Sequence, residues 1–220
     1  MNNKINSIAE KTISLYSGLG WKRLFAQIRF WDAPYKQVEK MITEKGIIID
    51  LGCGEGLFSN YLALGSKKRK IFGIEIDKNR IKYADRGLPN THFIFGDANK
   101  VSIPIADVIV LMHILHHVDS FKKQKELINL CWSRLRKGGK LIIVEVEPKF
   151  SLKYLIAFLT DHFLVAWIFE RKIYSPIHFR KKKDWLNLLS QIGFKVNSYP
   201  AHKNKPFSHI IFECNKLDKI

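Results

Sequence analysis

Short apolar segments rich in Ile and Val alternate with amphipathic segments along the middle of the chain. In the amphipathic segments the apolar residues recur every three or four positions, which is typical of helices. Strands that alternate with helices predict an α/β domain with a parallel sheet covered on both faces. We expect strands at 47–50, 70–76, 91–95, 107–112 and 141–146, and helices at 57–64, 79–86 and 120–135, the last ended by Gly138-Gly139.

The beginning of the chain does not follow this alternation. Residues 1–45 contain several large aromatic side chains and a helical pattern at 35–42. We expect these residues to form a helical N-terminal cap over the functional site. The α/β domain is then expected over 46–220.

Beyond Pro148 the pattern changes again. An apolar stretch at 152–169 has helical spacing, and a second, amphipathic helix is expected at 181–192. We therefore expect a helical insertion at 152–183 within the domain, a candidate lid over the substrate. Two further strands, at 194–199 and 209–214, are expected to complete the sheet as a hairpin.

The composition is that of a globular protein with an unusual charge. Hydrophobic residues make up 46% and charged residues 26%, which excludes a disordered, collagenous or purely coiled-coil chain. The 37 Lys and Arg against 20 Asp and Glu give a net charge of +17, and the excess is greatest in residues 149–220. Two interpretations stay open: a surface for anionic partners such as nucleic acid or acidic lipid, or a solvated face that keeps the protein soluble.

The cysteines and the apolar stretches indicate in which cellular compartment the protein is expected. Cys53, Cys131 and Cys214 lie far apart and form no CxxC pair, so neither a disulfide framework nor a zinc site is expected. Residues 1–8 lack the apolar core of a signal peptide. The stretch 154–169 is shorter than the ~20 residues that cross a bilayer. We expect a cytoplasmic protein, in one interpretation peripheral to the inner face of a membrane.

The most informative motif is a glycine-rich loop, Asp50-Leu51-Gly52-Cys53-Gly54-Glu55-Gly56, between the first strand and the first helix of the domain. Glycines let a backbone turn tightly and approach a ligand closely, and the following helix offers unpaired N–H groups. Residue 57 is Leu, so the GxGxxG pattern of a dinucleotide site is incomplete. An acid at position 50 suits a cationic or amino-bearing ligand better than a pyrophosphate.

Two further acids follow the next two strands. Glu75 ends the second strand, where a carboxylate can accept hydrogen bonds from both ribose hydroxyls, and Asp97 follows the third, where it could accept one from the amine of an adenine. Each acid alone could equally be a surface or helix-capping carboxylate. Their order at successive strand ends favours a shared nucleoside site.

With these motifs, residues 46–148 resemble the class I S-adenosylmethionine-dependent methyltransferases. The glycine loop is similar to the first motif of that family, and 73–77 and 96–98 to its ribose-binding and adenine-binding segments. The resemblance implies a Rossmann-like, doubly wound sheet of seven mostly parallel strands, the last one antiparallel. It also implies S-adenosylmethionine as the cofactor and S-adenosylhomocysteine as its product.

The resemblance assigns roles to particular residues. The glycine loop would approach the methionine part of the cofactor, Glu75 would hold the ribose, and Ile76 would pack on the adenine. Asp97 and Ala98 would lie along the edge of the adenine. The full set of implied cofactor-binding residues is Asp50, Gly52, Cys53, Gly54, Glu75, Ile76, Asp97, Ala98 and Met112.

A methyl acceptor that is a hydroxyl needs a general base, for which histidine is the first candidate. His113 follows the fourth strand, where the resemblance places the mouth of the active site, and we take it as the candidate catalytic residue. We expect capping or packing roles for His116 and His117. Glu145 and Glu147, at the end of the fifth strand, either reach the mouth or lie on the surface.

We therefore expect methyl transfer to a small-molecule or lipid-like acceptor. No Asn-Pro-Pro-Tyr-like motif follows the fourth strand, and no RNA-binding module is appended. The apolar stretch 154–169 with its basic flanks would suit a hydrophobic acceptor near an anionic membrane, or it is a core helix under a charged face. The alternatives are an RNA or protein methyltransferase that uses the basic surface, and an S-adenosylmethionine-binding module without turnover.

Overall fold

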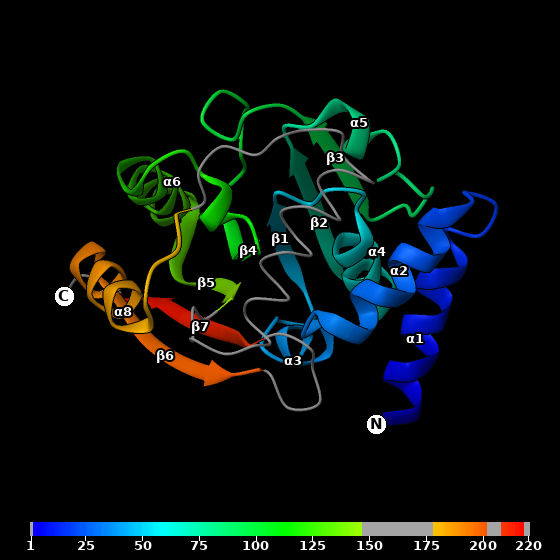
Figure 1. Ribbon diagram of the computed structural model, residues 1–220, viewed down its shortest axis with the longest axis horizontal. Coiled ribbons are helices and arrows are strands. Elements are labelled where there is room, and N and C mark those ends of the chain that lie inside the picture. Colours follow the sequence, from blue (N-terminus) through cyan, green and yellow to red (C-terminus); the bar gives the residue numbers. More distant parts are fainter. Residues whose placement is uncertain (1, 147–177, 202–207, 218–220) are drawn as a thin grey trace.

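Seven strands form one sheet in the order β3-β2-β1-β4-β5-β7-β6 in the computed structural model, which describes residues 2–146, 178–201 and 208–217 (Figure 1). Strands β1 to β5 pair in parallel, and β7 is antiparallel to both β5 and β6. The bounds are β1 Gly46–Leu51, β2 Arg69–Glu75, β3 Thr91–Phe95, β4 Ala106–Met112, β5 Leu135–Val146, β6 Phe194–Pro200 and β7 His209–Lys216. The expected seven-stranded, mostly parallel sheet with an antiparallel last strand is confirmed.

The central strands are apolar throughout because both faces of the sheet are covered. Successive side chains of β1 point to opposite faces, so Ile48 belongs to one buried cluster and Ile49 to the other. The same alternation places Val108 and Val110 of β4 in the first cluster and Ile109 in the second. A continuous apolar run in the sequence therefore supplies two separate cores.

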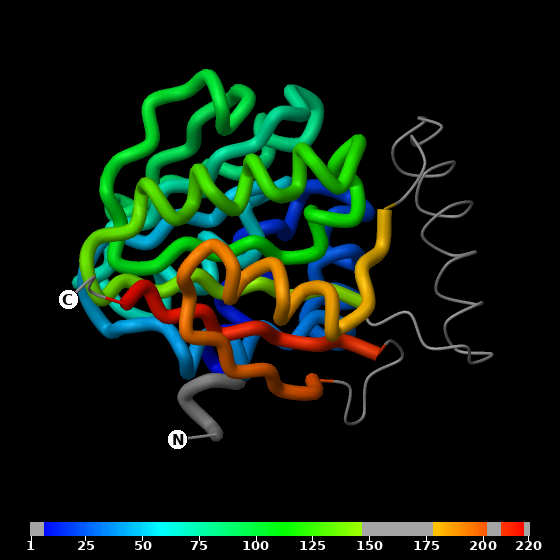
Figure 2. Tube along the Cα trace, turned by 90° about the vertical axis from the view of Figure 1, so that its left-hand side faces the viewer, coloured from blue at the N-terminus to red at the C-terminus, as the bar shows by residue number. Residues whose placement is uncertain are grey.

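Helices cover the two faces unequally. On one face the first cluster joins the sheet to the N-terminal helices and to the helix that follows the glycine loop. These helices are α1 Asn2–Ser14, α2 Trp21–Asp32, α3 Tyr35–Glu39 and α4 Leu57–Gly65. On the opposite face, seen from the front in Figure 2, lie α6 Phe121–Arg134 and α8 Lys182–Ile192. The helices of the N-terminal cap and the helix after the glycine loop therefore pack into one core on the same face of the sheet.

The structure corrects the end of one predicted helix. Helix α6 ends at Arg134, because Leu135 takes an extended conformation and is buried in strand β5 opposite Ala106. The glycines expected to end the helix, Gly138-Gly139, lie inside the first half of β5, where the register against β4 shifts. They accommodate that irregularity, with Gly138 at φ 65°, instead of capping the helix.

Two predicted helices are shorter than expected. Helix α5 covers Lys78–Ile81 instead of 79–86, and α3 ends at Glu39 instead of residue 42. The side chain of Asp77 caps the start of α5 by accepting a hydrogen bond from the Asn79 N–H. A 3-10 turn, η1 Leu115–His117, follows strand β4.

The expected insertion at 152–183 lies almost entirely outside the described residues. Only its last residues are seen, an irregular segment at 178–181 that leads into α8. The amphipathic pattern predicted for α8 is confirmed, with Trp185, Leu188 and Leu189 buried. None of the helices within the described ranges is long and apolar enough to cross a bilayer.

Candidate functional site

The glycine loop takes backbone conformations that exclude other residues. Gly52, Gly54 and Gly56 have φ values of 80°, 56° and 73°. A Cβ on Gly52 would lie 2.5 Å from Ile114 Cγ2, and a Cβ on Gly56 would lie 2.9 Å from the backbone of Ala84. The glycines are therefore required by both the turn and the close packing of the elements around it.

The two acids predicted to bind ribose and adenine, Glu75 and Asp97, lie close to this loop, as their order along the strands predicts. The Gly54 N–H donates a 2.7 Å hydrogen bond to Glu75 Oε2, and the Asp77 N–H donates to Oε1 at 2.9 Å. The Gly96 N–H donates to the backbone oxygen of Glu75 at 2.9 Å, so Asp97 comes directly beside it. Glycine loop, Glu75 and Asp97 thus share one edge of the sheet.

The surroundings of these acids suit a nucleoside. Each oxygen of Glu75 accepts one backbone N–H, which leaves acceptor capacity for hydroxyl groups. Ile76, next to it, is 67% exposed, which gives a flat base an apolar surface to pack on. Ala98 packs against the second core cluster. Asp97 Oδ1 accepts hydrogen bonds from the backbone N–H and from the side-chain amide of Asn99.

Asp50 is a buried acid beneath the loop. Ser59 Oγ donates a 2.6 Å hydrogen bond to Asp50 Oδ2. Burial and, to a smaller extent, the charge of Glu75 raise the pKa of Asp50 to about 6, against the lowering effect of the Ser59 hydrogen bonds. A cationic ligand group near this carboxyl would favour its ionised form, which is the ligand chemistry that the sequence suggested.

Two other predicted cofactor residues are also placed around the loop. Met112 ends β4 and is buried in the first core cluster. The Cys53 N–H donates to the backbone oxygen of Ile74, and burial raises the pKa of the Cys53 thiol well above its usual range. The thiol is therefore neutral and has no nucleophilic character at physiological pH.

The N-terminal cap contacts the glycine loop directly, through residues that the sequence did not single out. Lys22 of α2 and Glu55 of the loop form a buried ion pair, with Nζ 2.5 Å from Oε1. The Tyr16 hydroxyl donates a 2.7 Å hydrogen bond to the Glu55 backbone oxygen and accepts one from Asn60. No spacing or periodic pattern connects positions 16 and 22 to position 55, so only the folded chain reveals this contact.

His113, the candidate catalytic residue, has an unusual conformation. Its φ of 56° is the only positive value at a non-glycine residue among those the structure describes. Such strain persists only where the surroundings enforce it and is common at functional sites. The His113 N–H donates to the Val144 backbone oxygen at 2.9 Å. Its Nε2 is buried and makes no hydrogen bond within the described part of the chain.

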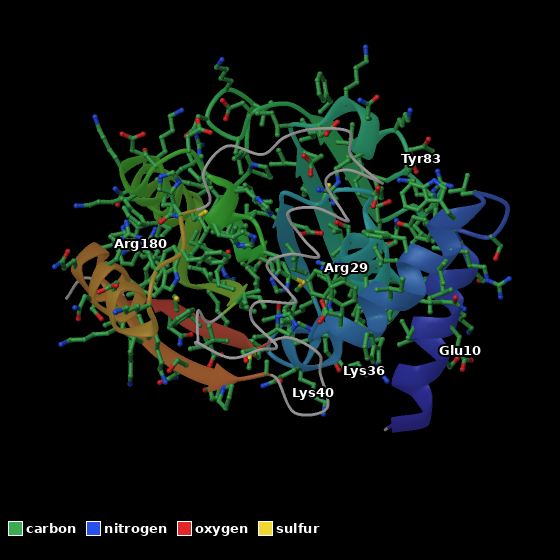
Figure 3. All side chains as sticks on the ribbon, in the orientation of Figure 1. Glu10, Arg29, Lys36, Lys40, Tyr83 and Arg180 are labelled. Carbon is green, nitrogen blue, oxygen red and sulfur yellow. The ribbon has the colours of Figure 1, made fainter. Side chains whose placement is uncertain are left out.

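One further polar residue packs against His113 and two more follow behind it, and the sequence indicated a function for none of the three. The ring of His209, at the start of β7, lies edge-on to His113 with centroids 4.8 Å apart. His209 Nε2 lies 3.0 Å from Asp32 Oδ1 at the end of α2, and Arg29 Nη1 lies 3.8 Å from Asp32 Oδ2. Figure 3 shows Arg29 near the centre of the molecule. We call His113, His209, Asp32 and Arg29 the acceptor-side cluster.

The electrostatics of this cluster keep one imidazole neutral. Burial lowers the pKa of His113 well below its ordinary value of 6.5, and the nearby charges of His209 and Arg29 lower it further. A neutral imidazole has one nitrogen lone pair that can accept a proton. The cluster can therefore hold a base at the carboxyl end of β4.

The other predicted histidines and acids have structural contacts. His116 is buried with Nδ1 2.5 Å from Glu145 Oε2, in agreement with the expected packing role. The Leu115 N–H donates to Glu145 Oε1, so both oxygens of this acid hold the η1 turn. The alternative that Glu145 lies on the surface is wrong, because it is 2% exposed. Glu147 lies outside the described residues.

Comparison with known proteins gives one consistent result. Residues 49–143 match a family model described as a methyltransferase domain. Myricetin 3'-O-methyltransferase 4 of Solanum lycopersicum is 29% identical over 147 residues, which cover 66% of this chain and 39% of the relative. A tRNA (guanine-N(7)-)-methyltransferase of Prochlorococcus marinus is 28% identical over 157 residues, which cover 62% of this chain and 68% of the relative. The chain spans about two fifths of the length of the plant relative and of a viral one.

Solved structures agree with the fold. A SAM-dependent methyltransferase structure from Methanosarcina mazei aligns with a TM-score of 0.60 at 21% sequence identity. The alignment covers 83% of this chain and 98% of the other. At this identity the similarity concerns the architecture of the chain.

Proposed function

We propose that the chain, whose residues 49–143 match a methyltransferase domain, is a class I S-adenosylmethionine-dependent enzyme that transfers the methyl group of that cofactor to a hydroxyl of a small or lipid-like acceptor. The observation that carries the proposal is the hydrogen bond that joins Gly54 of the glycine loop to Glu75, with Asp97 beside them. This arrangement places a tight loop and two acids at one edge of the sheet, as a nucleoside cofactor requires.

The cofactor would be held in two parts. The glycine loop and Asp50 would face its methionine part, whose amino group suits the buried carboxyl. Glu75 would accept hydrogen bonds from the ribose hydroxyls, while Ile76 would cover the adenine and Asp97 with Ala98 would line its edge. When bound, the sulfonium supplies an electrophilic methyl group, so the task left to the protein is to position the acceptor and exclude water.

His113 would then act as the general base for a hydroxyl acceptor. An acceptor hydroxyl would donate its hydrogen bond to His113 Nε2, the buried atom that makes no other hydrogen bond in the described structure. The bound cofactor would supply the methyl group, and His113 Nε2 would take up the proton that the acceptor hydroxyl loses. His209, fixed by Asp32, packs against the ring of His113 and holds its orientation.

The names of several relatives support a small hydroxyl acceptor. The Solanum lycopersicum relative is named for 3'-O-methylation of myricetin, and an inositol 4-methyltransferase of Mesembryanthemum crystallinum is 29% identical over 155 residues. A second candidate, methylation of RNA, is favoured by the similarity to a tRNA methyltransferase together with the net charge of +17. Steep loss of RNA binding with rising salt would distinguish it.

One labelling experiment tests both the activity and the acceptor class. The purified protein is incubated with radiolabelled S-adenosylmethionine and a lysate of its host, and lipid, small-molecule, RNA and protein fractions are counted. Label in the small-molecule or lipid fraction is expected. Label confined to RNA would move the proposal to the second candidate. Binding of the cofactor without label in any fraction would favour the non-catalytic module.

Cofactor titration by calorimetry tests the site itself. Glu75→Ala and Asp97→Ala should each weaken the binding of S-adenosylmethionine, because each removes an acceptor for cofactor hydrogen bonds. Asp184→Ala is the matched control, since Asp184 is an exposed acid in the first turn of α8. Unchanged affinity in both test variants would overturn the site assignment.

A further inference from the structure

Helix α2 has two faces that differ sharply in their surroundings. Its inner face contacts the site, with Lys22 on the glycine loop, Ala26 fully buried and Asp32 in the acceptor-side cluster. Its outer face carries Leu24 and Ile28, which are 58% and 46% exposed. Because its inner face is fixed by these contacts, the helix cannot rotate to bury the outer one.

The outer face is a continuous apolar stripe. Trp21, Leu24, Ile28 and Trp31 follow one another at spacings of three or four residues, so they lie along one side of the helix. Trp21 and Trp31, at the two ends, are 43% and 61% exposed. Four of the nine exposed large apolar side chains in the described structure thus lie on this one short helix. They form a cluster, in contrast to the single exposed apolar residues that are normal on protein surfaces.

The charges around the stripe are of one sign. Arg23, between the apolar positions, is exposed, and Lys36 and Lys40, exposed on and directly after α3, follow the end of α2 (Figure 3). The acids of the same segment are engaged in ion pairs, Asp32 with His209 and Glu39 with Arg69. The stripe is therefore flanked by exposed cations, while the acids of this segment are turned inward into ion pairs.

We propose that the outer face of α2, formed by Trp21, Leu24, Ile28 and Trp31 with Arg23, Lys36 and Lys40 beside it, docks the protein on an anionic lipid bilayer. A helix that lies in a membrane interface has this combination of tryptophan, aliphatic side chains and flanking Lys or Arg. A protein groove would accommodate the stripe, but the uniform positive flank matches the surface of an acidic membrane. The surface is independent of the proposed methyl transfer, although it would bring a lipid-like acceptor close to Asp32.

Vesicle co-sedimentation tests the surface without cofactor or acceptor. Wild-type protein is mixed with vesicles of equal parts phosphatidylcholine and phosphatidylglycerol, and with vesicles of phosphatidylcholine alone. We expect binding to the anionic vesicles, weaker binding to the neutral ones, and release as salt is raised. The double variant L24E/I28E should lower the partition coefficient about tenfold or more, because it places two acids in the stripe.

Ile105→Glu is the matched control, since Ile105 is 52% exposed in the loop before β4, away from α2. It should bind the vesicles as the wild type does. Thermal unfolding and S-adenosylmethionine titration of L24E/I28E should match those of the wild type, which shows that the fold and the cofactor site are intact. Failure of cofactor binding in the wild type would count against the proposed function and leave the docking surface standing.

Three results would overturn the proposal. The wild type would not sediment with anionic vesicles, or L24E/I28E would sediment as well as the wild type. Alternatively, light scattering would show a wild-type dimer that L24E/I28E converts to a monomer, without vesicle binding. That last result would assign the stripe to a second copy of this chain.

Discussion

The proposed cofactor side and the proposed acceptor side of the site are built in different ways. The proposed cofactor side uses residues 50–56, Glu75 and Asp97, which follow successive strands within one stretch of the chain. The acceptor-side cluster joins Asp32, His113 and His209, and its Asp32–His209 contact spans 177 positions. The cofactor side is therefore a product of the sheet topology, whereas the acceptor side depends on how the cap and the last strand pack.

Of the changes proposed here, removal of the His113 imidazole should have the largest effect, because it would impair the acceptor side and leave the cofactor side intact. His113→Asn should lower kcat/KM about 10²- to 10⁴-fold for a hydroxyl acceptor, the range for loss of a general base. Asn tolerates a positive φ, so the backbone can be kept. Binding of S-adenosylmethionine, measured by calorimetry, should not change.

The pH profile and a control make this test specific. The acid limb of kcat/KM in the wild type should lie below pH 6.5, because burial lowers the pKa of His113 from that value. His92→Asn, which changes an exposed histidine on β3, should leave kcat/KM unchanged. Equal activity of His113→Asn and wild type would remove His113 from the mechanism.

Breaking the ion pair between cap and loop should have the next largest effect. Lys22→Met leaves the Glu55 carboxylate buried without its partner, and loss of one member of a buried pair costs about 3–5 kcal/mol of unfolding free energy. Urea denaturation measures this loss. The double variant K22M/E55Q should recover much of it, and Lys123→Met, which removes an exposed and solvent-screened pair, should cost far less than Lys22→Met. If Lys22→Met costs no more than Lys123→Met, the cap does not stabilise the loop.

The glycine loop permits a test of close packing with backbone strain held constant. Gly56 and Gly87 have nearly the same φ, 73° and 72°, but a Cβ meets the Ala84 backbone at 2.9 Å only at Gly56, while Gly87 has open space. Gly56→Ala should therefore cost about 1–3 kcal/mol more than Gly87→Ala, the usual penalty for overpacking. Denaturation of both variants gives the difference. Equal costs would mean that strain alone keeps a glycine at position 56.

The sequence predicted correctly those features that depend on the local order of strands, glycines and acids along the chain. Glycine spacing, β-branched runs and acids at strand ends predicted the sheet and brought Glu75 to the glycine loop, because parallel strands end at a common edge. It failed for Asp32 and His209, since neither lies in a motif and their contact needs the antiparallel β7 beside the cap. It misplaced the end of α6, because burial of Leu135 in β5 outweighed the signal of Gly138-Gly139.

The smallest expected effect concerns Asp50, and it separates stability from function on the cofactor side. The folded-state pKa of Asp50 is about 6 against 3.8 in the unfolded chain, so the folded state binds the proton more tightly between these values. Unfolding free energy should consequently fall as pH rises through that window. Asp50→Asn removes this dependence and should be about 1–3 kcal/mol more stable than the wild type near pH 7, because no buried carboxylate has to ionise.

Denaturation of both proteins near pH 7 and near pH 5 measures this difference in unfolding free energy, and the contributions of other titrating groups cancel between them. The same variant should bind S-adenosylmethionine more weakly, since it has lost the charge that faces the amino group. A variant that is less stable at both pH values, with unchanged affinity, would show that the Asp50 carboxylate is a structural partner of Ser59 and not part of the cofactor site.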